Sequence, residues 1–133
     1  MASVLLDTRP LVALFKRNDT HHKRAVAWFK AHRGTLLTTQ AVVTEAWQLV
    51  SEPVRLPMPR FVMAACEIRK FDARGQARVL TVFERYADLP MDYADATLLV
   101  LGEIEKTNAV ATIDVNDFSV YRMANGKSVT LVF

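Results

Sequence analysis

Short apolar runs alternate with longer amphipathic segments along nearly the whole of this 133-residue chain. Runs rich in Val, Leu and Ile suit buried strands, whereas segments with apolar residues three and four positions apart suit helices. Strands that alternate with helices predict a parallel sheet covered by helices on both faces. We therefore predict an α/β fold of three layers, α/β/α, with a mostly parallel central sheet, in one domain over residues 1–133.

Turn and capping residues set the limits of the predicted elements. Strands are predicted over residues 3–6, 35–37, 66–71, 109–113 and 129–133. Helices are predicted over residues 8–16, 21–32, 40–51, 60–65, 72–87 and 93–106. Thr8 is a candidate N-cap, and either Thr38 or Thr39 can cap the helix that follows them. The aromatic side chains expected in the core are Trp28, Phe29, Trp47 and Phe83.

Composition excludes several classes of protein. Hydrophobic residues make up 51% of the chain, with only four glycines and five prolines, which argues against disorder. No apolar run is long enough for a transmembrane helix. Cys66 is the only cysteine, so neither an internal disulfide nor a cysteine-based zinc site can form. We expect a cytoplasmic protein without a membrane partner.

Charge is distributed unevenly between the two halves of the chain. Residues 1–70 hold eleven Lys and Arg against five Asp and Glu, whereas residues 71–133 hold six against nine. A basic half suits a protein that attracts a polyanion, and an acidic half suits one that holds a cation. An ordinary solvated surface would have the same composition, so charge alone leaves both interpretations open.

Two aspartates directly follow predicted strands. Asp7 comes after the first strand, and Asp114 comes after the strand over residues 109–113. Because the carboxyl ends of parallel strands meet at one edge of a sheet, both carboxylates should lie at that edge, where ligands bind in such folds.

Two further acids are expected at the same edge. Asp95 lies in the first turn of the helix that leads into the strand after it, and Glu45 lies early in the helix after the second strand. Both helices begin at the carboxyl edge because they run antiparallel to the strands. Taken singly, each of the four acids could start a turn, complement a helix dipole or simply be solvated.

Four converging carboxylates would repel one another and therefore need a cation. Ligands that are all oxygen suit Mg²⁺ or Mn²⁺ rather than zinc, and these metals activate water and neutralise phosphodiester charge. Arg9 and Arg122 are close to the acids in sequence. Either arginine could contact phosphate in a nucleic acid or simply offset the acidic charge.

Two of the candidate acids, Asp95 and Asp114, each have a second aspartate three residues away. Asp92 is better placed than Asp95 as the N-cap of its helix, which leaves Asp95 inside the first turn. For Asp114 and Asp117 we choose Asp114, because it closes the predicted strand.

Four segments resemble the successive motifs of the PIN-domain family, and in particular the VapC-type toxin ribonucleases of bacterial toxin–antitoxin pairs. The segments are LLDTRPLVALF, VVTEAW, LPMDYADATLLVLGEI and VATIDVNDFSVYR. The resemblance spans nearly the whole chain in the right order and is weakest over residues 52–72.

The resemblance implies a metal-dependent endoribonuclease, whose catalytic acids are Asp7, Glu45, Asp95 and Asp114. The metal ligands would be Asp7, Asp95 and Asp114, with Asp117 supporting the site and Thr112 lining it. It further implies an RNA substrate, products with a 5′-phosphate and a 3′-hydroxyl, a homodimer, and a small DNA-binding antitoxin as partner.

Two other functions fit parts of the pattern. An RNA-binding module that has lost catalysis would share the fold, although all four acids are present here. A Mg²⁺-dependent phosphatase or a receiver-like domain would also be α/β with clustered acids. A receiver should have adjacent acids after its first strand, whereas Asp7 stands alone.

Overall fold

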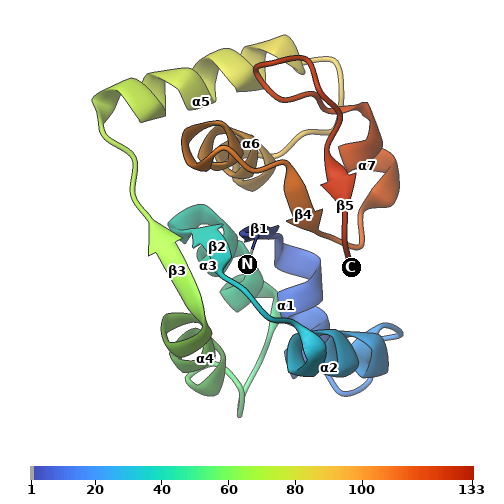
Figure 1. Ribbon diagram of the computed structural model, residues 1–133. Helices are drawn as coiled ribbons and strands as arrows, with labels where there is room; N and C mark the ends of the chain where they lie inside the picture. Colours follow the sequence, from blue (N-terminus) through green and yellow to red (C-terminus); the bar gives the residue numbers. More distant parts are fainter. Residues whose placement is uncertain (1) are drawn as a thin grey trace.

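A computed structural model describes residues 2–133 and contains one central sheet of five strands (Figure 1). The strands are β1 (Val4–Leu6), β2 (Leu36–Thr39), β3 (Cys66–Arg69), β4 (Ala109–Ala111) and β5 (Thr130–Leu131). Their order is β3-β2-β1-β4-β5, and every pairing in the sheet is parallel. From β1 the chain adds strands first on one side and then on the other, so strand order reverses at β1. Such a reversal opens a crevice at the carboxyl ends of the strands.

Seven helices connect or follow these strands in the described part of the chain. They are α1 (Thr8–Phe15), α2 (His22–Ala31), α3 (Gln40–Leu49), α4 (Pro57–Ala65), α5 (Ala73–Arg85), α6 (Tyr93–Glu105) and α7 (Val115–Val120). Figure 1 shows α5 and α6 on one side of the sheet and α1, α2 and α4 on the other. The predicted three-layer α/β/α fold with a parallel sheet is therefore confirmed.

Successive strand residues point to opposite faces of the sheet, and each face has its own core. Leu5, Leu37 and Val110 pack in the cluster that also holds the buried side of α6. Leu6, Leu36 and Ala111 pack in a second cluster, against Trp28 and Phe29 of α2. A third cluster joins α1, α3 and α4 through residues such as Leu11, Ala46 and Met58. The three inner strands, β2, β1 and β4, are buried on both faces, which explains their apolar runs.

Helix α6 is the most deeply buried helix, because every residue from Ala94 to Gly102 is buried. A Cβ added to Gly102 would lie 2.6 Å from Met123 Cε and 2.7 Å from the Thr107 carbonyl oxygen. A side chain at this position would therefore clash, so glycine allows the C-terminal end of α6 to pack closely against its neighbours. Because α6 runs antiparallel to the strands, its N-terminus lies at the carboxyl edge of the sheet.

Several sequence predictions were wrong in detail. Helix α7 was not predicted, because its six residues are too few to show a periodic apolar pattern. Strand β4 ends at Ala111 rather than at residue 113, and α4 begins at Pro57 rather than at residue 60. Asp7, not Thr8, occupies the N-cap position of α1.

Two aromatic residues predicted for the core lie at the surface. Trp47 and Phe83 are 39% and 41% exposed. The Trp47 indole N–H donates to the Arg55 carbonyl oxygen at 2.9 Å, and the Arg55 guanidinium lies 4.0 Å from the ring centre. The loop between α3 and α4 therefore covers Trp47 on one side, a local arrangement that helical periodicity does not reveal.

Candidate functional site

Asp7 lies at the carboxyl edge of the sheet, directly after β1, and is 2% exposed. Although it occupies an N-cap position, its side chain makes no capping hydrogen bond. Instead, Asp7 Oδ2 accepts a hydrogen bond of 2.7 Å from Thr112 Oγ1, which follows β4. The backbone N–H of Asp114 donates to the same Thr112 oxygen at 3.0 Å. Thr112 therefore ties the end of β1 to the loop that carries Asp114.

Asp95 is held at the first turn of α6 by a reciprocal pair of hydrogen bonds with Asp92. The Asp95 backbone N–H donates to Asp92 Oδ1 at 2.8 Å, and the Asp92 backbone N–H donates to Asp95 Oδ2 at 3.4 Å. This capping box matches the prediction that Asp92 is the N-cap and Asp95 lies inside the turn. Asp95 is buried, whereas Asp92 is exposed.

A tyrosine that sequence reasoning missed also contacts Asp95. The buried Tyr121 hydroxyl donates to Asp95 Oδ2 at 3.2 Å, and its ring packs between Tyr86 and Phe118. Burial, followed by the charge of Asp95, raises the pKa of Tyr121 above its ordinary value, so the phenol remains a hydrogen-bond donor. Tyr121 lies 26 positions from Asp95. No spacing rule connects such distant residues, so the sequence carried no signal for this contact.

Glu45 reaches the site from α3, whose N-cap is Thr39. Burial raises the pKa of Glu45, and the neighbouring charges of Asp92 and Asp114 raise it further. The structure thus brings Glu45 to the same edge as the aspartates, as the sequence predicted. The Thr8 hydroxyl is close enough to Glu45 to favour its charged form, but Thr8 Oγ1 is buried and makes no hydrogen bond of normal geometry within residues 2–133.

The two most buried acids have strongly raised pKa values. Burial raises the pKa of Asp7 to about 7, helped by the charges of Asp114 and Asp92 and opposed by the Thr112 hydrogen bond. Burial also raises the pKa of Asp95 to about 8, and the charge of Asp7 adds to the effect. The charges of Asp114 and Asp92 act on Asp7, and those of Asp7 and Asp92 act on Asp95, so these acids share one electrostatic environment.

Asp114 lies at the N-cap of α7 and is only partly buried. Burial and the charge of Asp117 raise its pKa, whereas the positive charge of Arg9 lowers it. Asp114 and Asp117 both line a hollow of about 280 Å³ beside α7. Asp114 does not directly follow the strand as predicted, because Thr112 and Ile113 separate it from the end of β4. The loop still carries it to the carboxyl edge.

The two arginines weighed in the sequence differ in their placement. Arg9 is close enough to Asp114 to lower its pKa. The Arg122 guanidinium instead donates to the carbonyl oxygens of Ser119 and Tyr121, both at 2.9 Å. Arg122 is therefore bound to the backbone at the end of α7 and is not brought onto the acids.

The donor set of this edge fits a hard divalent cation. The buried acids offer only oxygen, and their raised pKa values show that their negative charges lack compensation. Among residues 2–133, no three His, Cys, Asp or Glu side chains are grouped closely enough to enclose a metal ion as they stand. Mg²⁺ does not need such a cage, because it usually binds one or two carboxylates and keeps several waters.

Comparisons with known proteins agree on one family. The model of the PIN domain family matches residues 4–123. Ribonuclease VapC26 of Mycobacterium tuberculosis is 24% identical over 134 aligned positions, which cover 97% of this chain and 99% of that protein.

Solved structures show the same fold at low identity. The crystal structure of VapC20 from M. tuberculosis, described as a toxin that cleaves the sarcin–ricin loop, has a TM-score of 0.73 at 15% identity and covers 85% of this chain and 91% of its own. A toxin–antitoxin complex from Klebsiella pneumoniae has a TM-score of 0.69 at 16% identity, covering 98% and 96%. VapBC2 from Rickettsia felis, bound to a promoter DNA fragment, has a TM-score of 0.64 at 16% identity, covering 98% of both chains.

Proposed function

Because this chain belongs to the PIN-domain family, we propose that it is an endoribonuclease that depends on Mg²⁺ or Mn²⁺ and acts as the toxin of a type II toxin–antitoxin pair. The relative named ribonuclease VapC26 aligns over almost its whole length, which supports a ribonuclease of this type. The proposed substrate is RNA, cut by hydrolysis of a phosphodiester.

The observation that carries this proposal is the crowding of carboxylates at the carboxyl edge of the sheet. Asp7 and Asp95 are buried, the charge of Asp7 raises the pKa of Asp95, and the charge of Asp92 raises the pKa values of Asp7, Asp95, Glu45 and Asp114. A purely structural role would place each carboxylate beside a cation or a set of donors that lowers its pKa. The arrangement here stores unfavourable charge, which a bound divalent cation would compensate.

In the proposed mechanism, Asp7, Asp95 and Asp114 would hold the cation, and Glu45 would complete the catalytic set from α3. A divalent cation held there would activate a water molecule and neutralise charge on the phosphodiester. Thr112 orients the Asp7 carboxylate, and Tyr121 orients that of Asp95 through their hydrogen bonds. Asp117 adds negative charge beside Asp114, which Arg9 partly offsets.

The proposal includes assembly with other chains. Structural neighbours include a toxin–antitoxin complex and a VapBC2 complex on promoter DNA. We propose a homodimer and a small DNA-binding antitoxin for this chain as well, in the cytoplasm. No helix of residues 2–133 is long and apolar enough to cross a membrane. Light scattering at tens of micromolar should give the mass of a dimer, and a monomer at that concentration would contradict this part of the proposal.

Metal removal tests the catalytic proposal directly. Purified protein should cleave single-stranded RNA in Mg²⁺ or Mn²⁺, lose this activity in EDTA, and regain it when metal is restored. Asp72→Asn is a matched control, because Asp72 caps α5 away from the acids and Asn caps equally well. This variant should cleave like the parent under every condition. Undiminished cleavage by metal-free protein would rule out the proposed mechanism.

A further inference from the structure

A surface groove of about 730 Å³ is lined both by two of the site's acids and by two basic residues. Glu45 and Asp92 line one part of it, and Arg69 and Lys70, at the end of β3, line another. Continuing the register of the sheet places Asp7 level with Thr39, which pairs with Arg69. Since neighbouring strands are about 4.8 Å apart, the end of β3 lies roughly 10 Å from the end of β1.

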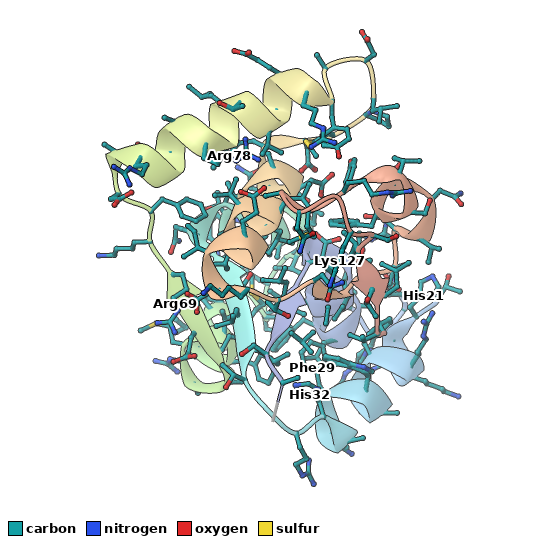
Figure 2. All side chains as sticks on the ribbon, turned by 45° about the horizontal axis from the view of Figure 1, so that its top comes forward. His21, Phe29, His32, Arg69, Arg78 and Lys127 are labelled. Carbon is teal, nitrogen blue, oxygen red and sulfur yellow. The ribbon has the colours of Figure 1, made fainter. Side chains whose placement is uncertain are left out.

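At the basic side of this groove, Lys70 is available to a ligand. Arg69, labelled in Figure 2, pairs with Glu67 and Glu105, with N–O distances of 3.4 Å in both cases. Lys70 is exposed and takes part in no ion pair within residues 2–133. A positive charge beside a set of carboxylates suits a ligand that carries several negative groups in a row. One negative group would lie at the cation proposed for the acids, and the next negative group would lie at Lys70.

The groove also presents aromatic surface. Tyr93 is 53% exposed and immediately follows Asp92 at the start of α6. Phe71 is half-buried and packed against the core, and a Cβ at Gly75 would come within 3.0 Å of it. Phe71 is therefore a fixed part of the wall, whereas the Tyr93 ring is free to receive a flat group. Proteins bind single-stranded nucleic acid by this combination of a basic groove and an aromatic platform.

We propose that this groove binds the RNA strand next to the phosphodiester that is cut, with Lys70 contacting a backbone phosphate and Tyr93 stacking on a base. The inference depends on the proposed ribonuclease function only for the identity of the ligand, and it assigns residues that the family resemblance does not. It also explains why the substrate should be single-stranded, because bases in a helix cannot stack on a protein side chain.

RNA binding without cleavage provides the test. The full-length chain is titrated with a fluorescein-labelled single-stranded RNA of mixed sequence in EDTA, and anisotropy is recorded at several salt concentrations. Lys70→Ala should weaken binding and reduce the slope of log K against log salt by about 0.7, the value for one phosphate contact. Tyr93→Ala should weaken binding about tenfold, whereas Tyr93→Phe should bind like the parent because it retains the ring.

Lys127→Ala is the matched control. Lys127 lines a different hollow, of about 410 Å³, with the C-terminal end of α6, and lies apart from Arg69 in Figure 2. Its removal should leave both affinity and salt slope unchanged. Any one of three results would overturn the inference. Lys70→Ala could keep the parent's salt slope, or Lys127→Ala could lose as much RNA affinity and salt slope as Lys70→Ala. Tyr93→Phe could also bind RNA as weakly as Tyr93→Ala. Circular dichroism melts check that each variant is folded.

Failure of this inference can be distinguished from failure of the proposed function. Metal-dependent cleavage with RNA binding unaffected by these variants would reject the groove alone. If the same variants then lost binding to an antitoxin, the groove would belong to that partner. If the parent never cleaves RNA but the Lys70 and Tyr93 variants lose RNA binding, the proposed nuclease activity is rejected and the groove remains an RNA-binding site.

Discussion

The two edges of the central sheet differ in how their polar groups are stabilised. At the amino edge, Gly102 packs against Met123 and the Thr107 carbonyl, and the Thr107 hydroxyl donates to the Ser3 carbonyl oxygen at 2.8 Å. The Asn108 side chain likewise donates to the Ser128 carbonyl oxygen at 3.0 Å. At the carboxyl edge, Asp7 and Asp95 are buried among like charges, and Thr8 Oγ1 makes no hydrogen bond of normal geometry within residues 2–133.

This contrast distinguishes an edge whose contacts stabilise the fold from the edge where we propose that catalysis takes place. Thr107 and Asn108 at the amino edge are hydrogen-bonded, whereas the acids of the carboxyl edge are under electrostatic strain. Unfavourable interactions between carboxylates lower the stability of the metal-free fold, and the proposed cation would offset them. Changes at the two edges should therefore separate activity from stability.

The largest expected effect is the loss of cleavage in Asp95→Asn. A metal is worth several kcal/mol to the transition state, so loss of a ligand should reduce the cleavage rate about a thousandfold or more. The change keeps the shape of the side chain and should leave the protein folded. Initial rates on a labelled RNA in Mg²⁺ measure this effect. A variant that retains a tenth of the parent's rate would mean that Asp95 is not a metal ligand.

The second effect lies at the opposite edge and should alter stability without altering chemistry. Gly102→Ala forces a methyl group against the Thr107 carbonyl and Met123, which should lower the free energy of unfolding by about 1–3 kcal/mol. Alanine regains roughly 1 kcal/mol in helix propensity, so the net loss should be up to about 2 kcal/mol. Urea unfolding measures the loss, and the folded variant should cleave RNA at the parent's rate. Unchanged stability would show that this edge is less tightly packed than the distances indicate.

The third effect is an increase in stability from removing a charge at the carboxyl edge. In the absence of metal, the folded state binds more protons than the unfolded state between pH 4 and the raised pKa values of about 7 for Asp7 and about 8 for Asp95. The stability of metal-free protein should therefore fall as pH rises through this range. Asp7→Asn should reduce this fall and raise the melting temperature in EDTA at pH 8 by a few degrees, equivalent to about 1 kcal/mol.

Two comparisons sharpen this third prediction. Mg²⁺ should stabilise the parent more than Asp7→Asn, because it binds only the intact folded site well. Asp72→Asn should melt like the parent, since Asp72 accepts a capping hydrogen bond from the Gly75 N–H at 2.9 Å and asparagine can do the same. If Asp7→Asn melts lower than the parent in EDTA, and Mg²⁺ shifts neither protein, then Asp7 has a structural role.

The smallest expected effect separates the two aspartates at the start of α6. Asp92→Asn should keep most of the cleavage activity, because asparagine also accepts the hydrogen bond that Asp92 takes from the Asp95 N–H at 2.8 Å. Cleavage rates and melts of Asp92→Asn and Asp95→Asn, measured together, test the assignment. A greater loss of activity in Asp92→Asn would reverse the roles assigned to the pair.

Much of this architecture could be predicted because each local pattern agreed with the fold. The alternation of strands and helices determined a parallel α/β sheet, and the position of Asp7 after β1 placed it at the ligand-binding edge. The capping pattern also separated Asp92 from Asp95 correctly, because an N-cap and its N3 partner are three residues apart.

Only the tertiary structure decided what surrounds these acids. The contacts of Asp95 with Tyr121 and of Asp7 with Thr112 join residues 26 and 105 positions apart. The groove that links Glu45 to Lys70 exists because β2 and β3 are neighbours in the sheet. Local sequence determines where a helix or strand begins, because capping and periodicity act over a few residues. Burial, pKa shifts and shared cavities depend on which distant segments of the chain pack together. Patterns over a few neighbouring residues do not reveal these long-range contacts.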